Sequence, residues 1–327
     1  MRFVFFGTPD YVVPVLELLH KTFKSKTGEF PIAAVVTQPP KPTGRKKELT
    51  YSPVDEWAYK KGVSKFFKFY DLLKNNITAD VGILASYGEI IPTEVINLFQ
   101  YGILNIHPSI LPLWRGASPV QATIISETQA GSSIIKLDEK LDHGPIIAQF
   151  KDELLPDDTS ETLRKRLFKR SAEVLVTLIP AYLSGKITPR KQDHSKATFT
   201  REIKKSDGFI PPEYLNTTLQ GASFKGNWKI DFMRDFIIHP SPSILHNFIR
   251  AMQPWPGTWT NIRIRNQDLR LKILKSHLEP QIKQETSTTH RTQSTKHNLV
   301  LDEVQLEGKN PVPWKQFKEG YPGSNLA

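Results

Sequence analysis

The chain has 327 residues, a formal net charge of +11 at pH 7 and no cysteine. This length predicts two domains, and the lack of cysteine excludes disulfides, thiolate metal sites and a cysteine nucleophile, which suits a cytoplasmic enzyme. The positive charge favours a polyanionic partner such as a nucleic acid, although solubility alone also explains such a charge.

Buried strands and helices alternate through the first third of the chain. Apolar, β-rich runs predict strands at 2–6, 31–36 and 80–85, while apolar spacing and capping residues predict helices after Asp10, at 53–62 and at 93–99. The apolar start is short and Gly7 interrupts it, so we expect a first strand and not a signal peptide. No apolar run approaches the ~18 residues of a membrane-spanning helix.

The turn from Gly7 to Asp10 joins the first strand to the first helix, and such a turn can hold a phosphate. A nicotinamide-dependent oxidoreductase is nevertheless disfavoured, because the G-x-G-x-x-G spacing is missing and no acidic residue ends the second strand. We therefore interpret the turn as the tight connection that opens a doubly wound sheet.

A proline-rich basic segment follows the second strand, from Gln38 to Lys47. Its prolines disfavour a helix or a central strand, so we expect a flexible loop. Most charge runs of this kind are solvated surface. The cations of the segment also fit a nucleic-acid contact, because a guanidinium binds phosphate in a bidentate manner and stacks on bases. They are Lys41, Arg45, Lys46 and Lys47.

The most informative stretch of the chain begins with an apolar run over residues 102–106, which predicts a buried strand. Side chains two residues apart on a strand point to the same face, so Asn105 and His107 are expected side by side. They lie at the carboxyl end of the strand, where open α/β sheets place their ligands.

A fixed loop and a helix follow this strand. Pro108 ends the strand because it cannot donate to the ladder, and the residues as far as Gly116 form the loop. Ser118 and Pro119 then open a helix that reaches about Ser126. Ser109 is not expected to be a nucleophile, because the G-x-S-x-G elbow is absent.

An Asp-x-Gly turn, Asp142 to Gly144, lies between short predicted strands at 133–137 and 146–150. Such a turn can aim a carboxylate back at His107. A lone histidine after a strand or a lone Asp-x-Gly turn is more often structural. Together with Asn105, however, they form a polar trio suited to a carbonyl carbon that becomes tetrahedral.

The second half of the chain predicts a helix after Asp157 that ends at Gly185, a polar boundary from Pro189 to about Pro212, and a helix capped by Pro242-Ser243. Alternating strands with basic outer positions follow at 258–264 and 269–274, and residues 299–305 complete the sheet. Residues 277–298 are poor in apolar side chains and predict an exposed or disordered loop. Composition alone supports a small, basic, mostly β domain here.

Several motifs resemble those of the folate-dependent formyltransferases. They are Asn105-x-His107, the loop from Ser109 to Gly116, and Leu141-Asp142-x-Gly144. Further motifs narrow the resemblance to the formyltransferases that act on methionyl-tRNA, namely Phe5-Phe6-Gly7-Thr8-Pro9, Thr37-Gln38-Pro39 and Arg250-Ala251-x-x-Pro254-Trp255-Pro256-Gly257.

This resemblance implies a Rossmann-like α/β fold with an open, mostly parallel sheet and helices on both faces, followed by a smaller OB-like β-barrel domain. It places a catalytic domain at 1–190, a linker at 191–206 and a tRNA-binding domain at 207–327. Two segments, near 214–242 and 277–298, depart from the family pattern as insertions. We expect a cytoplasmic monomer with no membrane association.

The resemblance also implies the substrates and the residues that bind them. The formyl donor is 10-formyltetrahydrofolate, the partner is initiator methionyl-tRNA, and no metal is required. Asn105, His107 and Asp142 are the expected catalytic residues. The expected folate-binding residues are Tyr87, Gly88, Ile90, Ser109, Ile110, Leu111, Pro112, Arg115, Gly116, Asp138, Leu141 and Gly144. The expected tRNA-binding residues are Lys41, Arg45, Lys46, Lys47, Arg263, Arg265 and Lys272.

Some alternatives stay open at this point. Arg115 suits an ion pair that holds its loop as well as it suits a ligand contact. The acceptor amine of a formyltransferase can also belong to glycinamide ribonucleotide or to an amino sugar, but such small substrates require neither the basic loop nor a basic β domain. A non-catalytic RNA-binding protein is disfavoured because the polar trio is intact. Binding of reduced folate, of nicotinamide or of neither distinguishes these classes.

Overall fold

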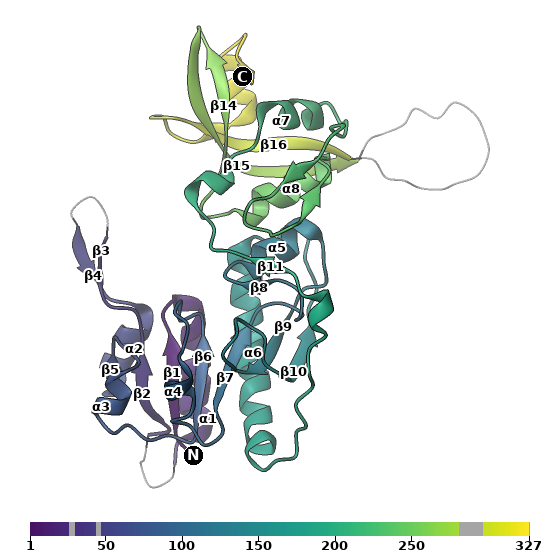
Figure 1. Cartoon of the computed structure of the whole chain (residues 1–327). Helices are drawn as coiled ribbons and strands as arrows, with labels where there is room; N and C mark the ends of the chain where they lie inside the picture. The colour runs from purple at the N-terminus through teal and green to yellow at the C-terminus, as the bar shows by residue number, and fades with distance from the viewer. Residues whose placement is uncertain (26–29, 44–46, 281–296, 327) are drawn as a thin grey trace. The chain divides into compact units, whose positions relative to one another are not determined.

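The computed structural model describes residues 1–25, 30–43, 47–280 and 297–326, which form two compact units (Figure 1). The first unit comprises Met1–Pro119, Gln129–Glu153 and Thr162–Phe199. The second comprises Val120–Thr128, Leu154–Glu161 and Thr200–Ala327, so two short earlier segments belong with the C-terminal part of the chain. The domain limits at residues 190 and 207 stay a prediction.

A seven-stranded sheet forms the centre of the first unit, in the order β10-β9-β7-β6-β1-β2-β5. Five neighbouring strands are parallel: β7 (Ile103–His107), β6 (Val81–Ala85), β1 (Phe3–Gly7), β2 (Ile32–Val36) and β5 (Ser64–Phe66). The remaining two, β9 (Gly131–Lys136) and β10 (Ile146–Lys151), join as an antiparallel hairpin at one edge. The predicted open, mostly parallel sheet is confirmed.

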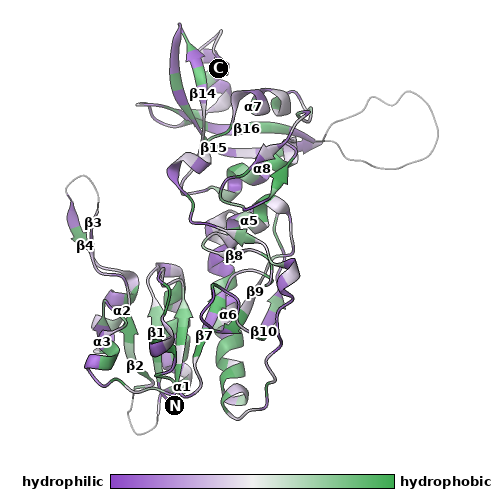
Figure 2. Ribbon diagram, viewed as in Figure 1, coloured by the Kyte–Doolittle hydropathy of each residue, from purple (hydrophilic) through white to green (hydrophobic). Residues whose placement is uncertain are grey.

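Helices cover both faces of this sheet, because its strands are apolar on both sides. Phe3 and Phe5 of β1 pack with helices α1 (Val13–Phe23), α2 (Pro53–Lys61) and α6 (Ser160–Leu183). The alternate residues Val4 and Phe6 pack on the opposite face with the short helices α3 (Asp71–Lys74) and α4 (Thr93–Ile96). Figure 2 shows β1 and β6 as largely hydrophobic. Burying each such large side chain contributes about 1.5–3 kcal/mol to stability.

Local signals set the ends of α2 as the sequence predicts. The Ser52 hydroxyl accepts a hydrogen bond from the Asp55 N–H at 3.0 Å, and Pro53 occupies the first turn. Gly62 ends the helix with a φ of 67°, in the left-handed region that glycine adopts at low cost.

The proline-rich basic segment differs from the loop that the sequence predicts. Lys41–Thr43 (β3) and Glu48–Thr50 (β4) pair as an exposed antiparallel hairpin. A two-stranded ribbon has only edge strands, so a proline such as Pro42 is tolerated there. Arg45 and Lys46 lie outside the described residues.

A five-stranded antiparallel sheet dominates the second unit, in the order β17-β16-β15-β14-β18. Its strands are Val312–Pro313 (β17), His297–Leu306 (β16), Gln267–Pro280 (β15), Thr258–Ile264 (β14) and Asn325–Leu326 (β18). Helices α7 (Pro212–Leu219), α8 (Pro242–Ala251) and α9 (Trp314–Gly320) accompany it, and Ser241, one residue before the predicted cap, caps α8. This antiparallel β domain is consistent with the expected OB-like barrel.

The predicted loop at 277–298 is wrong at both ends. Strand β15 continues to Pro280 and β16 begins at His297, because residues 277–280 pair antiparallel with residues 297–300, and such backbone pairing does not require apolar side chains. Residues 281–296 lie outside the described residues. The atypical segment 214–242 contains most of α7 and a hairpin of β12 (Trp228–Lys229) with β13 (Ile237–Ile238).

Among the described residues, no helix combines the length and the apolar character needed to cross a bilayer.

Candidate active site

Strand β7 carries the two central polar side chains of the first unit. Leu104 and Ile106 point into the core beneath α6, so the alternate residues Asn105 and His107 face the other side of the sheet. Their side chains are nonetheless buried, with residue exposures of 5% and 4%. Ile103 packs on the same face of the sheet as Asn105, two residues before it in the strand.

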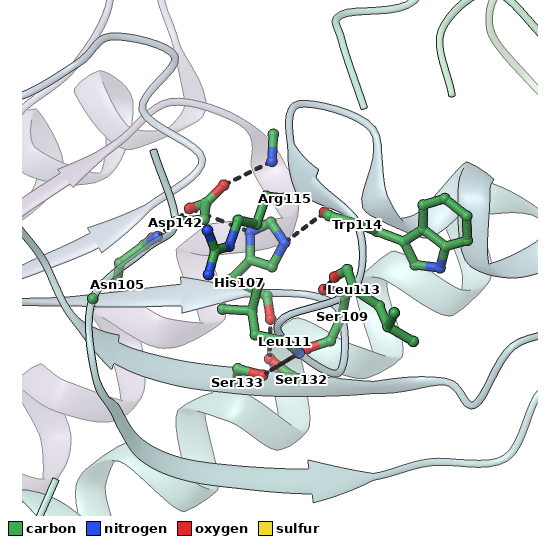
Figure 3. A network of polar contacts seen from close by, with 12 residues as sticks. Asn105, His107, Ser109, Leu111, Leu113, Trp114, Arg115, Ser132, Ser133 and Asp142 are labelled. Atoms are coloured by element: carbon green, nitrogen blue, oxygen red, sulfur yellow. Dashed lines mark hydrogen bonds and ion pairs between the residues drawn. The ribbon is translucent and has the colours of Figure 1, made fainter. Parts of the chain in front are cut away.

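Asp142 lies next to both Asn105 and His107, as the sequence predicts (Figure 3). The Asn105 Nδ2 group donates to Asp142 Oδ1 at 3.1 Å, and His107 Nδ1 lies 3.5 Å from the same oxygen. The backbone N–H of Gly116 donates to Asp142 Oδ2 at 2.8 Å. The carboxylate is 7% exposed and faces donors on both of its oxygens, which fixes its orientation.

The loop after β7 determines which ring nitrogen of His107 carries hydrogen. His107 Nε2 lies 2.9 Å from the main-chain carbonyl oxygen of Trp114. A carbonyl oxygen only accepts hydrogen bonds, so Nε2 is the donor and Nδ1 faces Asp142. Trp114 has a φ of 60°, a conformation that the surrounding loop must hold in place.

That loop is fixed by hydrogen bonds within itself and to β9. The Ser109 hydroxyl donates to the Leu113 carbonyl at 2.6 Å, and the Leu111 N–H donates to the Ser133 hydroxyl at 3.1 Å. Ser133 in turn donates to the Ser109 carbonyl at 2.7 Å. Ser109 and Leu111 are therefore buried and engaged inside the loop, whereas Ile110 and Pro112 are partly exposed.

Arg115 lies near the end of this loop and is 4% exposed. Its Nη2 donates to Gln192 Oε1 at 2.7 Å and to His194 Nδ1 at 2.8 Å. Burial lowers the pKa of the guanidinium from its usual value. These contacts with Gln192 and His194 hold the loop in place and support the loop-holding alternative for Arg115.

Sequence reasoning missed Gln192 and two histidines. The Gln192 Nε2 group donates to the carbonyls of Asp142 and Gly144, at 2.9 and 2.7 Å. His143 stacks on His194 with ring centroids 3.9 Å apart, and its Nδ1 lies 2.6 Å from Asp138 Oδ2. The sequence shows Gln192 only as part of a polar linker, because its partners are about fifty residues away in the chain.

The other predicted folate-binding residues lie at two turns. Gly88 has a φ of +90° and open space around its Cα, while Tyr87 is buried and Ile90 is exposed. Burial raises the pKa of the Tyr87 hydroxyl. The turn follows β6 next to β1, where the strand order reverses and α/β sheets bind ligands. At the Asp-x-Gly turn, Leu141 is exposed.

The predicted tRNA-binding cations lie in both units and are exposed where the structure describes them. Lys41 and Lys47 belong to the β3–β4 hairpin of the first unit. Arg263 and Lys272 share the outer face of the β14–β15 hairpin in the second unit, and Arg265 lies in its turn. The predicted basic outer face of this sheet is confirmed.

Within the described ranges, no three histidine or acidic side chains are grouped so that they could hold a metal ion.

Comparison with known proteins agrees with this architecture. A family model described as formyl transferase matches residues 1–179, and a model of the formyl transferase C-terminal domain matches residues 239–322. The chain therefore belongs to the formyl transferase family.

Within this family, the chain is similar over nearly its full length to curated methionyl-tRNA formyltransferases. The chain is 32% identical to the methionyl-tRNA formyltransferase of Herpetosiphon aurantiacus over 335 residues, which cover 98% of each protein. It is 31% identical to that of Dictyoglomus thermophilum over 341 residues, covering 98% of this chain and 97% of the relative. A solved N-formyltransferase from Helicobacter canadensis, in complex with folinic acid and dTDP-3-aminofucose, shares the fold at 15% identity. Its TM-score is 0.62, and the match covers 92% of this chain and 98% of the other.

Proposed function

We propose that this chain transfers the formyl group of 10-formyltetrahydrofolate to the α-amine of initiator methionyl-tRNA. The observation that carries the proposal is the buried, hydrogen-bonded cluster of Asn105, His107 and Asp142 at the carboxyl end of β7. Two full-length relatives named methionyl-tRNA formyltransferase support the choice of acceptor.

The reaction exchanges one C–N bond for another. The neutral amine attacks the formyl carbon, the carbon becomes tetrahedral, and its oxygen gains negative charge. The bond to the folate nitrogen then breaks, while one proton leaves the amine and one reaches the leaving nitrogen. No covalent bond to the protein is required.

Asn105 and His107 supply hydrogen-bond donors where negative charge develops. Asn105 has two amide hydrogens, of which one is engaged by Asp142, and His107 carries hydrogen on Nε2. Removing one donor of this kind lowers the rate of other acyl-transfer enzymes by roughly 10²–10³. For His107 Nε2 to donate to the substrate oxygen, its contact with the Trp114 carbonyl must be replaced during the reaction.

Asp142 orients both donors and relays a proton. Its Oδ1 contacts Asn105 and His107, while the Gly116 N–H holds Oδ2. A carboxylate fixed in this way keeps the imidazole in one orientation and can accept the proton that the amine releases.

Two further surfaces complete the proposal. The turns at Tyr87–Ile90, Ser109–Gly116 and Asp138–Gly144 bind the folate, and Arg115 is one of the residues of the second turn. The cations of the β3–β4 segment and of the β14–β15 face bind tRNA, because exposed lysine and arginine attract phosphates. We further propose that the protein acts as a cytoplasmic monomer.

A formylation assay tests this function. Purified protein is incubated with charged initiator methionyl-tRNA and 10-formyltetrahydrofolate, and formylmethionyl-tRNA is measured. Glycinamide ribonucleotide and an amino-sugar nucleotide serve as alternative acceptors in parallel. The proposal is supported if methionyl-tRNA is formylated and the two alternative acceptors are not. Product only from another amine overturns the choice of acceptor, and tRNA binding without any product indicates a non-catalytic RNA-binding protein.

A further inference from the structure

We infer that Gln192 is a positioning residue that holds the Asp142 turn against the loop after β7 and thereby sets the direction of the Asp142 carboxylate. This inference rests on the proposed function, because it assigns Gln192 a role in the use of Asp142. Gln192 follows β10 and α6 in the chain and precedes β11 (Phe199–Thr200), yet its side chain reaches back to the turn between β9 and β10.

The contacts of Gln192 use both ends of its amide. Oε1 accepts from Arg115 Nη2 at 2.7 Å, while Nε2 donates to the carbonyls of Asp142 and Gly144 at 2.9 and 2.7 Å. The residue is 5% exposed, so water does not replace these bonds at low cost. One side chain therefore joins the loop after β7 to the Asp-x-Gly turn.

The polarity of these contacts selects glutamine. Arg115 can only donate, and the two carbonyls can only accept. A glutamate in this place keeps the bond to Arg115 but sets an oxygen against two carbonyl oxygens. A methionine of similar size loses all three hydrogen bonds.

The backbone of the turn that Gln192 holds is also constrained at Asp142 and at Gly144. Asp142 has a φ of 48°, which is unfavourable for a non-glycine residue and persists only where neighbours enforce it. A Cβ on Gly144 would lie 1.8 Å from the Lys136 carbonyl oxygen, so the turn approaches β9 as closely as glycine permits. Gln192 bonds the carbonyl on each side of His143 and thereby fixes the peptide groups that set the direction of the Asp142 carboxylate.

Loss of this brace should move Asp142 relative to Asn105 and the Gly116 N–H without removing any group that contacts substrate. A displacement of about 1 Å at a reacting group can cost roughly 10²-fold in rate. We therefore expect Gln192→Met and Gln192→Glu to lower kcat by about tenfold to a hundredfold. The KM values for folate and for methionyl-tRNA should change much less than kcat, because no side chain proposed to contact either ligand is removed.

Gln129→Met is the matched control. The Gln129 Nε2 group also donates to two backbone carbonyls, those of Ala130 at 3.1 Å and Asp152 at 2.8 Å, but at a turn without candidate site residues. We expect its kcat to equal that of the wild type. Thermal unfolding of all variants establishes that each is folded at the assay temperature.

A double-mutant cycle with Asp142→Asn separates positioning from general support of the fold. If Gln192 acts through Asp142, Gln192→Met lowers kcat in the wild-type background and changes it little in the Asp142→Asn background. Additive losses in the two backgrounds, or wild-type kcat in both Gln192 variants, would overturn the inference.

A crystal structure of Gln192→Met tests the placement of Asp142 whatever the acceptor proves to be. We expect the bond from the Gly116 N–H to Asp142 Oδ2 to be broken or lengthened. An unmoved carboxylate would contradict the positioning role. If the wild type fails to formylate methionyl-tRNA, the proposed function fails, but this structural outcome still decides the role of Gln192.

Discussion

The cluster at the end of β7 and the cationic face of β14–β15 differ in the burial of their charged side chains. Asp142 is buried and both its oxygens face donors, whereas Arg263 and Lys272 are exposed on the outer face of their hairpin. A buried charge is costly unless its partners are fixed, so its geometry is precise. An exposed charge costs little, moves freely and acts at a distance that salt can screen.

Ion pairs on the exposed face illustrate the difference. Arg263 binds Asp268 through Nε at 2.8 Å and Nη2 at 3.0 Å, yet both side chains are more than half exposed. Such pairs add little to stability. The buried, fixed charge of the first region fits the catalytic role that we propose for it, and the exposed, mobile charges of the second region fit the proposed contact with a polyanion.

The largest expected effect is that of Asp142→Asn. The groups that hydrogen-bond the two carboxylate oxygens are donors, namely the Asn105 amide at Oδ1 and the Gly116 N–H at Oδ2. The side-chain amide of this variant has the same shape as the carboxylate, but in either orientation its NH₂ group faces one of these donors. We expect kcat to fall by roughly 10²–10⁴, the range typical of lost acid–base catalysis, in a steady-state formylation assay.

Asp71→Asn serves as the control for this variant, because Asp71 lies at the start of α3 and pairs only loosely with Lys74, at 3.7 Å. It should retain wild-type kcat. Comparable kcat values for Asp142→Asn and the wild type would remove Asp142 from the mechanism.

A smaller effect is expected from Lys272→Ala on the cationic face. Because the side chain is exposed and its bond to Gln305 is long, at 3.4 Å, its removal should leave the fold and kcat unchanged. The KM for methionyl-tRNA should rise severalfold, and the dependence of log affinity on log salt should weaken by about one unit. Measurements of tRNA binding at several salt concentrations check both values.

Lys186→Ala removes an equal charge from an exposed position after α6 and is the matched control. If both lysine variants bind tRNA as the wild type does, or weaken it equally, the β14–β15 face is not the specific contact surface.

The smallest expected effect concerns pH and His194. Desolvation, followed by the neighbouring His143 and Arg115, lowers the pKa of His194 from 6.5. The folded state therefore favours neutral His194, whose Nδ1 accepts from Arg115. This contribution to stability is complete above the unfolded-state value of about 6.5 and is lost as the pH falls below it.

His194→Asn keeps an acceptor but does not titrate. Between pH 7.5 and 5.5 its Tm should fall less than that of the wild type. Thermal unfolding at matched ionic strength measures the difference. A wild-type Tm that falls no more than that of the variant would contradict a neutral His194 in the folded state.

Much of the fold can be predicted because strong local signals coincide with long-range packing. The buried strands β1, β6 and β7 are apolar runs, and Ser52 with Gly62 defines α2. The short strand β5 and helix α3 were missed, because segments of this length have almost no periodicity. The ends of β15 and β16 were missed because their exposed residues dominate the composition.

The candidate site divides in the same way. Asn105 and His107 follow from the two-residue period of a strand, and Asp142 from a turn motif. Gln192 and the His143–His194 stack could not be predicted, because each depends on residues about fifty positions apart that only the folded chain brings together.

The single-turnover rate of His107→Ala tests the central claim most directly. With saturating 10-formyltetrahydrofolate and charged initiator methionyl-tRNA, this rate reports the chemical step and not binding or product release. We predict a fall of roughly 10²–10³ relative to the wild type, with both substrates still bound, because a donor to the developing negative charge is lost. An unchanged single-turnover rate would show that the cluster at the end of β7 is not where the formyl group is transferred.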